Sequence, residues 1–320
     1  MNRRFAIIQA LVSVVALAAV VVWASRQESP HIPTDAKAIA WLVGAVGLYA
    51  IATLVRAERW HQILELTGVH STRTDCYALT TVGYMGNNVL PARAGEALRV
   101  VLLSQRSDGS KRTLLGSVVA ERLLDVIALV TIFVVTVYGV LSTSEVLPTD
   151  HPLIVSGIGV VLVIAAAAAI WILRAHHIFE RARDWLRPLA AAPRALLNRR
   201  GLLLLAGTFL LWTTEATVYL AVARAIDLNF SVSGALYLVA LTNFVAALPA
   251  APGSIGTFDA AVAFGAKALG ATGSAAVSYV ILLRFVLYVP ITIVGLVVLV
   301  TRYGGWSRLR SAARLEASSA

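Results

Sequence analysis

The sequence predicts an all-α polytopic membrane protein with about six transmembrane helices plus two re-entrant or broken hairpins in an inverted-topology repeat. The 320 residues are 58% hydrophobic and 14% charged, and the mean hydropathy is +0.79. Soluble domains are nearer to about 45–50% apolar and about 25% charged. Apolar runs long enough to span a bilayer recur along the chain. The phrase Leu-Pro-Ala-x-x-Gly occurs twice, at 90–95 and 248–253.

Six apolar segments are long enough to cross the membrane, since a crossing needs about 20 apolar residues. They are 5–24, 37–55, 113–140, 153–173, 201–222 and 274–301.

The charges between these segments predict their orientation. The connections 25–36 and 142–152 carry few or no basic residues and are expected outside. Arginines and lysines concentrate after the second crossing (Arg56, Arg59 and Arg73), before the third, within 174–200 and after the sixth. Basic residues mark the cytoplasmic side. We therefore expect a multi-pass protein of a cell membrane (the bacterial cytoplasmic membrane), with both termini in the cytoplasm.

The predicted domain organisation has three parts. Residues 1–36 form an N-terminal signal anchor or first transmembrane helix. A cleaved signal peptide is the alternative, but the apolar run is longer than the usual 7–15 residues of such peptides. Residues 37–301 form the membrane domain, with repeat halves 37–140 and 201–301 joined by 141–200. Residues 302–320 form a basic cytoplasmic tail. Within the joining segment, 178–189 predicts an amphipathic helix on the cytoplasmic leaflet.

The repeated phrase is a Pro/Gly break inside each of two apolar stretches. By the charge pattern, 76–103 begins and ends inside, whereas 233–272 begins and ends outside, either as a hairpin or as two full crossings. A helix break survives in lipid only where protein or a watery cavity satisfies its backbone. Paired breaks in corresponding halves indicate a transporter-like binding site. A chance match in an Ala-rich sequence is the alternative, and the shared order of helix, broken hairpin and helix argues against it.

Charged and amide side chains inside the apolar segments are the candidate site. Each charge at the bilayer centre costs about 2.5–3.5 kcal/mol on insertion scales, so these groups must pair or line a hydrated cavity. Structural ion pairing and contact with a polar ligand both remain open, and Glu215 is the expected partner of Arg284. Asp259 and Lys267 are expected near the outer surface, and Tyr288 and Trp212 in packing roles. The candidates are Asn87, Asn88, Arg93, Glu96, Arg99, Glu121, Arg122, Asp125, Glu215, Asn243, Pro249, Gly253, Gly256 and Arg284.

The breaks also predict the charge of the ligand. Short helices that begin near 95–96 and 253–254 would point their N-termini into the membrane interior. Helix N-termini favour anions. We therefore expect Arg93, Arg99, Arg122 and Arg284 to contact an anionic head group, while Glu96, Asp125 and Glu215 pair with them or carry protons.

Several chemistries lack their motifs. The sequence contains no GxxxxGK[ST], no HExxH and no GxSxG, and its single cysteine excludes a disulfide framework. Without these motifs, we expect no cofactor and no metal. We expect no nucleic-acid partner, because the positive charge lies at the ends of apolar runs. No catalytic acid–base pair is evident, so we expect that the protein is not an enzyme. An intramembrane enzyme is the alternative.

Three spaced motifs resemble the lysylphosphatidylglycerol synthase transmembrane region family, also called the flippase-like domain. They are the run 83–99 (GYMGNNVLPARAGEALR), the run 121–125 (ERLLD) and the run 248–256 (LPAAPGSIG), with 56–60 (RAERW) upstream. The resemblance implies a role in moving aminoacylated phospholipid between leaflets. It also implies that aminoacyl transfer needs a separate soluble domain. We expect a stand-alone member without that synthase activity.

Together these observations predict a lipid flippase or transporter for an anionic phospholipid or a lipid-linked head group. The alternative is a non-transporting membrane subunit or scaffold for a lipid-modifying or cell-envelope glycosyltransferase enzyme. The expected partners are the membrane lipid substrate and an envelope-biogenesis enzyme.

Overall fold

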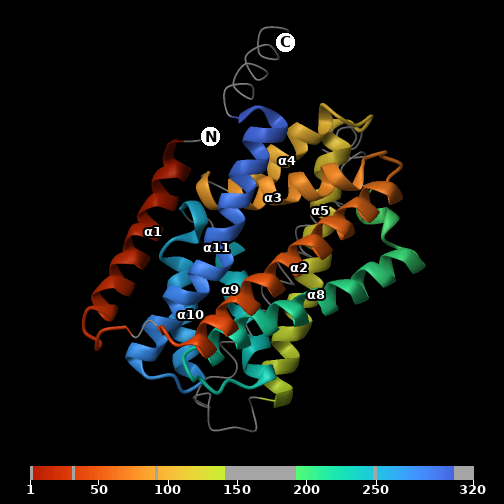
Figure 1. Cartoon of the computed structure of the whole chain (residues 1–320). Helices are drawn as coiled ribbons and strands as arrows, with labels where there is room; N and C mark the ends of the chain where they lie inside the picture. The colour runs from red at the N-terminus through yellow and green to blue at the C-terminus, as the bar shows by residue number, and fades with distance from the viewer. Residues whose placement is uncertain (1–2, 31–32, 91–92, 141–191, 248–250, 306–320) are drawn as a thin grey trace.

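All regular elements in the described part of the chain are helical (Figure 1). The computed structural model describes residues 3–30, 33–90, 93–140, 192–247 and 251–305. The elements in order are α1 (Arg3–Ala24), α2 (Ala36–Leu66), α3 (Arg73–Val89), α4 (Gly95–Ser104), α5 (Lys111–Val134) continued by a π-helix η2 (Val135–Val140), α8 (Arg199–Arg224), α9 (Val232–Ala247), a 3-10 turn η4 (Pro252–Ser254), α10 (Thr257–Ala268) and α11 (Gly273–Tyr303).

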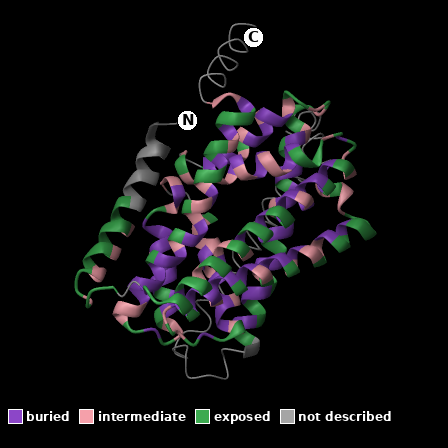
Figure 2. Ribbon diagram, viewed as in Figure 1, coloured by how far each residue is buried: buried purple, intermediate pink, exposed green. Residues whose placement is uncertain are grey.

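Three described helices are long and apolar enough to cross a membrane, namely α2, α8 and α11. They correspond to the predicted crossings 37–55, 201–222 and 274–301. The first and third predicted crossings are also helical, as α1 and α5. The outward surfaces of the long helices are apolar, since Val43 and Ile51 of α2 and Ile293 of α11 are more than half exposed. Exposed residues follow the outer helices in Figure 2. Such a surface suits lipid.

Several predictions lie outside the described residues. They concern the crossing 153–173, the connection 142–152, the amphipathic helix 178–189 and most of the tail 302–320.

Helix α2 is longer than its apolar run predicts. It begins after the N-cap Asp35, whose carboxylate accepts from the Ala38 N–H, and it continues to Leu66. Arg56 and Arg59 therefore lie inside the helix, and both are buried. Their assignment to a cytoplasmic connection was wrong, because the drop in hydropathy at Arg56 marks a polar face inside the protein.

The helix contacts of the two halves follow one pattern. Helix α3 packs on α4 and α2, as α9 packs on α10 and α8. The contact of α4 with α5 corresponds to that of α10 with α11. Between the halves, α3 packs on α11 and α9 on α5, while α2 packs on α8. Each half is thus a helix, a broken hairpin and a second helix, in that order along the chain (Figure 1).

The α3–α4 hairpin closes by direct backbone contact. A Cβ on Gly95 would lie 1.9 Å from the Gly83 carbonyl oxygen and 2.5 Å from the Asn87 nitrogen. No side chain fits at that distance, so glycine is required for the approach. Cys76, on α3, is buried in a hydrophobic cluster with Leu79 and Leu103 and carries a free thiol.

Asp75 ties the start of α3 to the end of α11. Its carboxylate accepts from Arg302 at 2.9 Å, from Arg106 at 3.2 Å and from the Thr72 hydroxyl at 2.8 Å. Burial alone would raise the pKa of Asp75, but the Thr72 hydrogen bond and the two guanidinium groups outweigh it, and the pKa is lowered. Asp75 is therefore an ionised anchor between the two halves.

Candidate functional site

A network of six charges, four of them buried and two half-buried, surrounds the middle of α5 and is here called the α5 charge cluster. It consists of Arg59, Glu96, Arg99, Glu121, Arg122 and Asp125.

Glu121 is the centre of this cluster. Its carboxylate lies 2.8 Å from Arg99, 2.8 Å from Arg122 and 3.4 Å from Arg59, and the residue is only 1% exposed. Arg99, a candidate site residue from the sequence, is thus a member of the cluster. Arg59 of α2 is a further member that the sequence interpretation missed.

Asp125 and Glu96 supply the other two negative charges of the cluster. Asp125 pairs with Arg59 at 2.7 Å and with Arg122 at 3.1 Å, and Glu96, in the first turn of α4, lies 3.3 Å from Arg122. Three guanidinium groups thus face three carboxylates. Buried charges persist only when paired in this way.

The second half contains a simpler pair. Arg284 of α11 contacts both carboxylate oxygens of Asp259, at 2.6 and 3.0 Å, and donates to the Gly253 carbonyl at 3.3 Å. Asp259 is buried in the first turn of α10, where it also accepts from the Gly256 N–H. Asp259 is therefore buried within the protein and ion-paired, while its expected position near the outer surface of the membrane stays a prediction.

Glu215 is not the partner of Arg284. It pairs with Arg56 of α2, and both side chains are buried where α2 and α8 pack together. The predicted pairing was wrong because both acids lie within apolar helices, and only the helix packing decides which one reaches Arg284.

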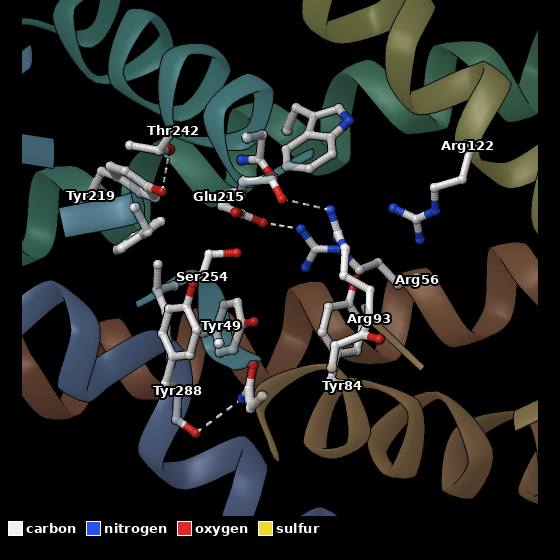
Figure 3. Close-up of a pocket in the computed structure, with 18 residues that line it drawn as sticks. Tyr49, Arg56, Tyr84, Arg93, Arg122, Glu215, Tyr219, Thr242, Ser254 and Tyr288 are labelled. Carbon is white, nitrogen blue, oxygen red and sulfur yellow. Dashed lines mark hydrogen bonds and ion pairs between the residues drawn. The ribbon is translucent and has the colours of Figure 1, made fainter. Parts of the chain in front are cut away.

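A polar pocket lies between the two helix breaks. Its volume is about 730 Å³, including its open mouth, and residues from α2, α3, α5, α8, α9, α10 and α11 and from both breaks line it. Figure 3 shows Arg56, Arg93 and Arg122 on one side of this pocket in the view, and Tyr219, Thr242 and Tyr288 on the other. Guanidinium groups from three separate parts of the chain therefore reach the same space.

Arg56 is held in an aromatic cage. Its guanidinium carbon lies 5.2 Å from the centre of the Trp212 ring, 5.8 Å from Tyr84 and 6.0 Å from Tyr49. Such contacts stabilise a cation. The Nη1 atom of Arg56 and the Nε1 atom of Trp212 are buried and have no hydrogen-bond partner in the structure. Two donors of pocket-lining residues are therefore buried without a hydrogen-bond partner.

Arg93 connects the two breaks. It follows α3 with a φ of +53°, which is uncommon for a residue other than glycine. Its guanidinium donates to the carbonyl of Ala246, in the last turn of α9, at 3.2 Å. The side chain is exposed. The break of the first half thus reaches the hairpin of the second half at the pocket.

Amides and hydroxyls form the rest of the polar lining. Asn88 donates to the Thr292 hydroxyl at 2.8 Å, and the hydroxyls of Tyr219 and Thr242 are 2.8 Å apart. Asn243 donates to the carbonyl of Val239.

The predicted site residues divide into two groups in the structure. Those that line the pocket are Asn87, Asn88, Arg93, Arg122, Glu215, Asn243 and Gly253. Those that pair behind it or shape the breaks are Glu96, Arg99, Glu121, Asp125, Arg284 and Gly256. Pro249 lies outside the described residues.

The sequence interpretation missed Arg56 and most aromatic lining residues, including Tyr49, Tyr84 and Trp212. Trp212 was expected only to pack. An available signal was that Arg56 and Arg59 are three residues apart and share a helix face. Among the described residues, no group of three or more His, Cys, Asp or Glu side chains could hold a metal ion.

These features define a multi-pass α-helical membrane protein with a buried ion-pair network beside a polar pocket. The chain belongs to the family described as the lysylphosphatidylglycerol synthase TM region, which it matches over residues 7–295. The predicted family membership is thus confirmed.

Three curated relatives match the chain. Glycosyltransferase AglD of Haloferax volcanii is 24% identical over 340 residues, which cover 92% of this chain and 54% of that protein. A UPF0104 membrane protein of Methanothermobacter thermautotrophicus is 23% identical, covering 78% of this chain and 81% of that protein. A UPF0104 membrane protein of Pyrococcus horikoshii is 27% identical over 130 residues, 39% of this chain and 37% of that protein. The chain therefore spans about half of the first relative. No solved structure matches the chain.

Proposed function

We propose that this protein moves an anionic phospholipid or a lipid-linked anionic head group between the leaflets of the membrane. The observation that carries the proposal is the convergence of Arg56, Arg93 and Arg122 on one pocket between two helix breaks. Guanidinium groups bind phosphate oxygens through planar, paired hydrogen bonds. Intramembrane charged groups mark substrate pathways when they line a hydrated cavity.

An inverted-topology repeat is part of the proposal. Arg122 lies eleven residues after Lys111, the first residue of α5. Arg284 lies eleven residues after Gly273, the first residue of α11. Each of these arginines pairs with an acid in the first turn of the short helix that follows its break, Glu96 in α4 or Asp259 in α10. Equivalent pairs in two oppositely oriented halves support alternating access around a fixed site.

The transport test is reconstitution of the purified protein into liposomes that contain head-group-labelled anionic lipids. We expect the label of the inner leaflet to become accessible to a membrane-impermeant reductant faster than in protein-free liposomes. Arg93→Gln should slow this exchange about tenfold, the factor given by about 1.4 kcal/mol. Arg224→Gln, which changes an exposed arginine at the end of α8, is the matched control and should exchange like the unchanged protein.

Exchange no faster than in protein-free liposomes, across several anionic lipids, would contradict the proposal. If Arg93→Gln exchanges lipid as fast as the unchanged protein, Arg93 does not contact the transported head group.

The second candidate is a membrane scaffold for an envelope glycosyltransferase. One relative has a name that denotes a glycosyltransferase, and this chain covers 54% of that protein. A scaffold predicts co-purification with such an enzyme and normal function of Arg93→Gln. The transporter predicts loss of exchange with normal folding, so the same variant separates the two.

A further inference from the structure

We propose that the pocket selects lipids whose head is a phosphodiester that carries an uncharged polyhydroxyl group, such as a glycerol, an inositol or a sugar. This inference rests on the proposed function, because it names the substrate class of the same pocket. Three properties of the described residues carry it, namely the net charge around the pocket, the occupied aromatic faces and the unpartnered polar atoms.

The charges around the pocket leave one positive charge without an acidic partner. Six guanidinium groups face five carboxylates, and each carboxylate is ion-paired. Arg93 is the arginine whose recorded partner is a backbone carbonyl instead, that of Ala246. A phosphodiester carries one negative charge and would complete the balance, whereas a phosphomonoester carries about 1.5 to 2 at neutral pH. The arginines are Arg56, Arg59, Arg93, Arg99, Arg122 and Arg284, and the acids are Glu96, Glu121, Asp125, Glu215 and Asp259.

The groups that would bind an amine are already occupied. A carboxylate or a free aromatic face binds an ammonium group most strongly. Glu215, the acid among the described lining residues, pairs with Arg56, which also lies over the Trp212 ring. In the second half, Arg284 lies 4.7 Å from the centre of the Tyr288 ring and 5.5 Å from that of Phe258. A cationic head group would have to displace an arginine.

The remaining lining suits hydroxyl groups. Nη1 of Arg56 and Nε1 of Trp212 are unpartnered donors, and Oδ1 of Asn87 is an unpartnered acceptor. A hydroxyl both donates and accepts, so a polyhydroxyl group can satisfy donors and acceptors together. Asn243 adds an amide to the lining, and Thr242 adds a hydroxyl on the side of the pocket that lies opposite the arginines in Figure 3.

The test compares lipids with identical acyl chains by native mass spectrometry of the whole protein in detergent. Phosphatidylglycerol and phosphatidylinositol carry a phosphodiester and a polyol. Phosphatidylserine has the same net charge but an amine, and phosphatidic acid has a phosphomonoester. A glycosyl polyprenyl phosphate shows whether a different lipid tail is accepted. We expect the polyol lipids to bind about tenfold more tightly than phosphatidylserine, which corresponds to about 1.4 kcal/mol. Equal binding of phosphatidylserine, or tightest binding of phosphatidic acid, would overturn the inference.

Two variants separate the parts of the head group. Asn243→Leu should reduce the preference for polyol lipids severalfold and leave phosphatidylserine binding unchanged. Asn229→Leu, an exposed amide between α8 and α9, is its control. Arg93→Gln should weaken all these anionic lipids by a similar factor and keep the preference. A uniform loss of binding in Asn243→Leu would count against selection by hydroxyl contacts.

Failure of the inference can be distinguished from failure of the transport proposal. If polyol lipids bind preferentially but do not exchange in liposomes, the selectivity stands and transport fails. If phosphatidylglycerol and phosphatidylserine exchange equally fast, transport stands and the selectivity fails.

Discussion

The two Arg–acid pairs of the proposed repeat halves have the same local design but different surroundings. Arg122 and Glu96 are 3.3 Å apart and belong to the α5 charge cluster, and Arg122 lines the pocket. Arg284 and Asp259 are 2.6 Å apart, pair with no other side-chain charge in the described residues, and are flanked by aromatic rings. The comparison teaches that an Arg–acid pair can by itself hold a helix break in place, as in the second half. In the first half, additional charges around the same kind of pair form a polar site.

The largest expected effect comes from breaking the centre of the cluster. Glu121→Gln leaves Arg59, Arg99 and Arg122 without their shared carboxylate. Removing one partner of a buried ion pair costs about 3–5 kcal/mol. We expect a large fall in the thermal unfolding midpoint of the purified protein. Glu58→Gln, which removes a partly exposed pair with Arg73, is the control and should cost under about 1 kcal/mol. Equal midpoints for the two variants would contradict this account of the cluster.

The two breaks differ in their need for glycine, and Gly95→Ala tests the first. The new methyl group would collide with the backbone of α3, and overpacking of this kind costs about 1–3 kcal/mol. In the second break, Gly256 has a φ of +85°, so Gly256→Ala strains the backbone instead. Gly47→Ala is the control, because a Cβ at Gly47 meets no atom within 4 Å. Thermal unfolding of the three variants measures the difference, and a neutral Gly95→Ala would contradict the close approach.

The isolated pair should tolerate loss better than the cluster. Asp259→Asn removes the carboxylate of Arg284, whose side chain is 25% exposed and can reach water. We expect a cost of about 1.5–3 kcal/mol, the contribution of hydrogen bonds to charged groups. A double-mutant cycle with Arg284→Gln should give a coupling of about 0.5–3 kcal/mol. A coupling near zero would mean that the pair does not hold the break.

The smallest effect on stability is expected at Arg93. The side chain is exposed and makes one hydrogen bond to a backbone carbonyl, so Arg93→Gln should change the free energy of unfolding by under about 0.5 kcal/mol. Lipid exchange should nevertheless fall. Arg122→Gln, in contrast, should lower both stability and exchange. If Arg93→Gln unfolds the protein, the residue is a structural link between the breaks.

The sequence predicted the helical membrane class, the two breaks and the charges around the first one, because these depend on composition and on spacing within a segment. It could not predict which acids and arginines pair. Glu215 and Arg56 are 159 positions apart, and their contact depends on how α2 packs on α8. The same limit applies to Tyr49 and Trp212, because an aromatic side chain in an apolar helix has the same sequence signature whether it packs or lines a pocket.

The buried thiol of Cys76 makes the protein suitable for site-directed labelling. It is the single cysteine of the chain, and its side chain is fully buried between helices. Maleimide reagents should therefore leave the folded protein unmodified, and reporter cysteines can be added without first replacing Cys76. Cysteines placed at Ala94 and Ser254, beside the two breaks, would then show by impermeant-reagent access from which face of the membrane each break is reached.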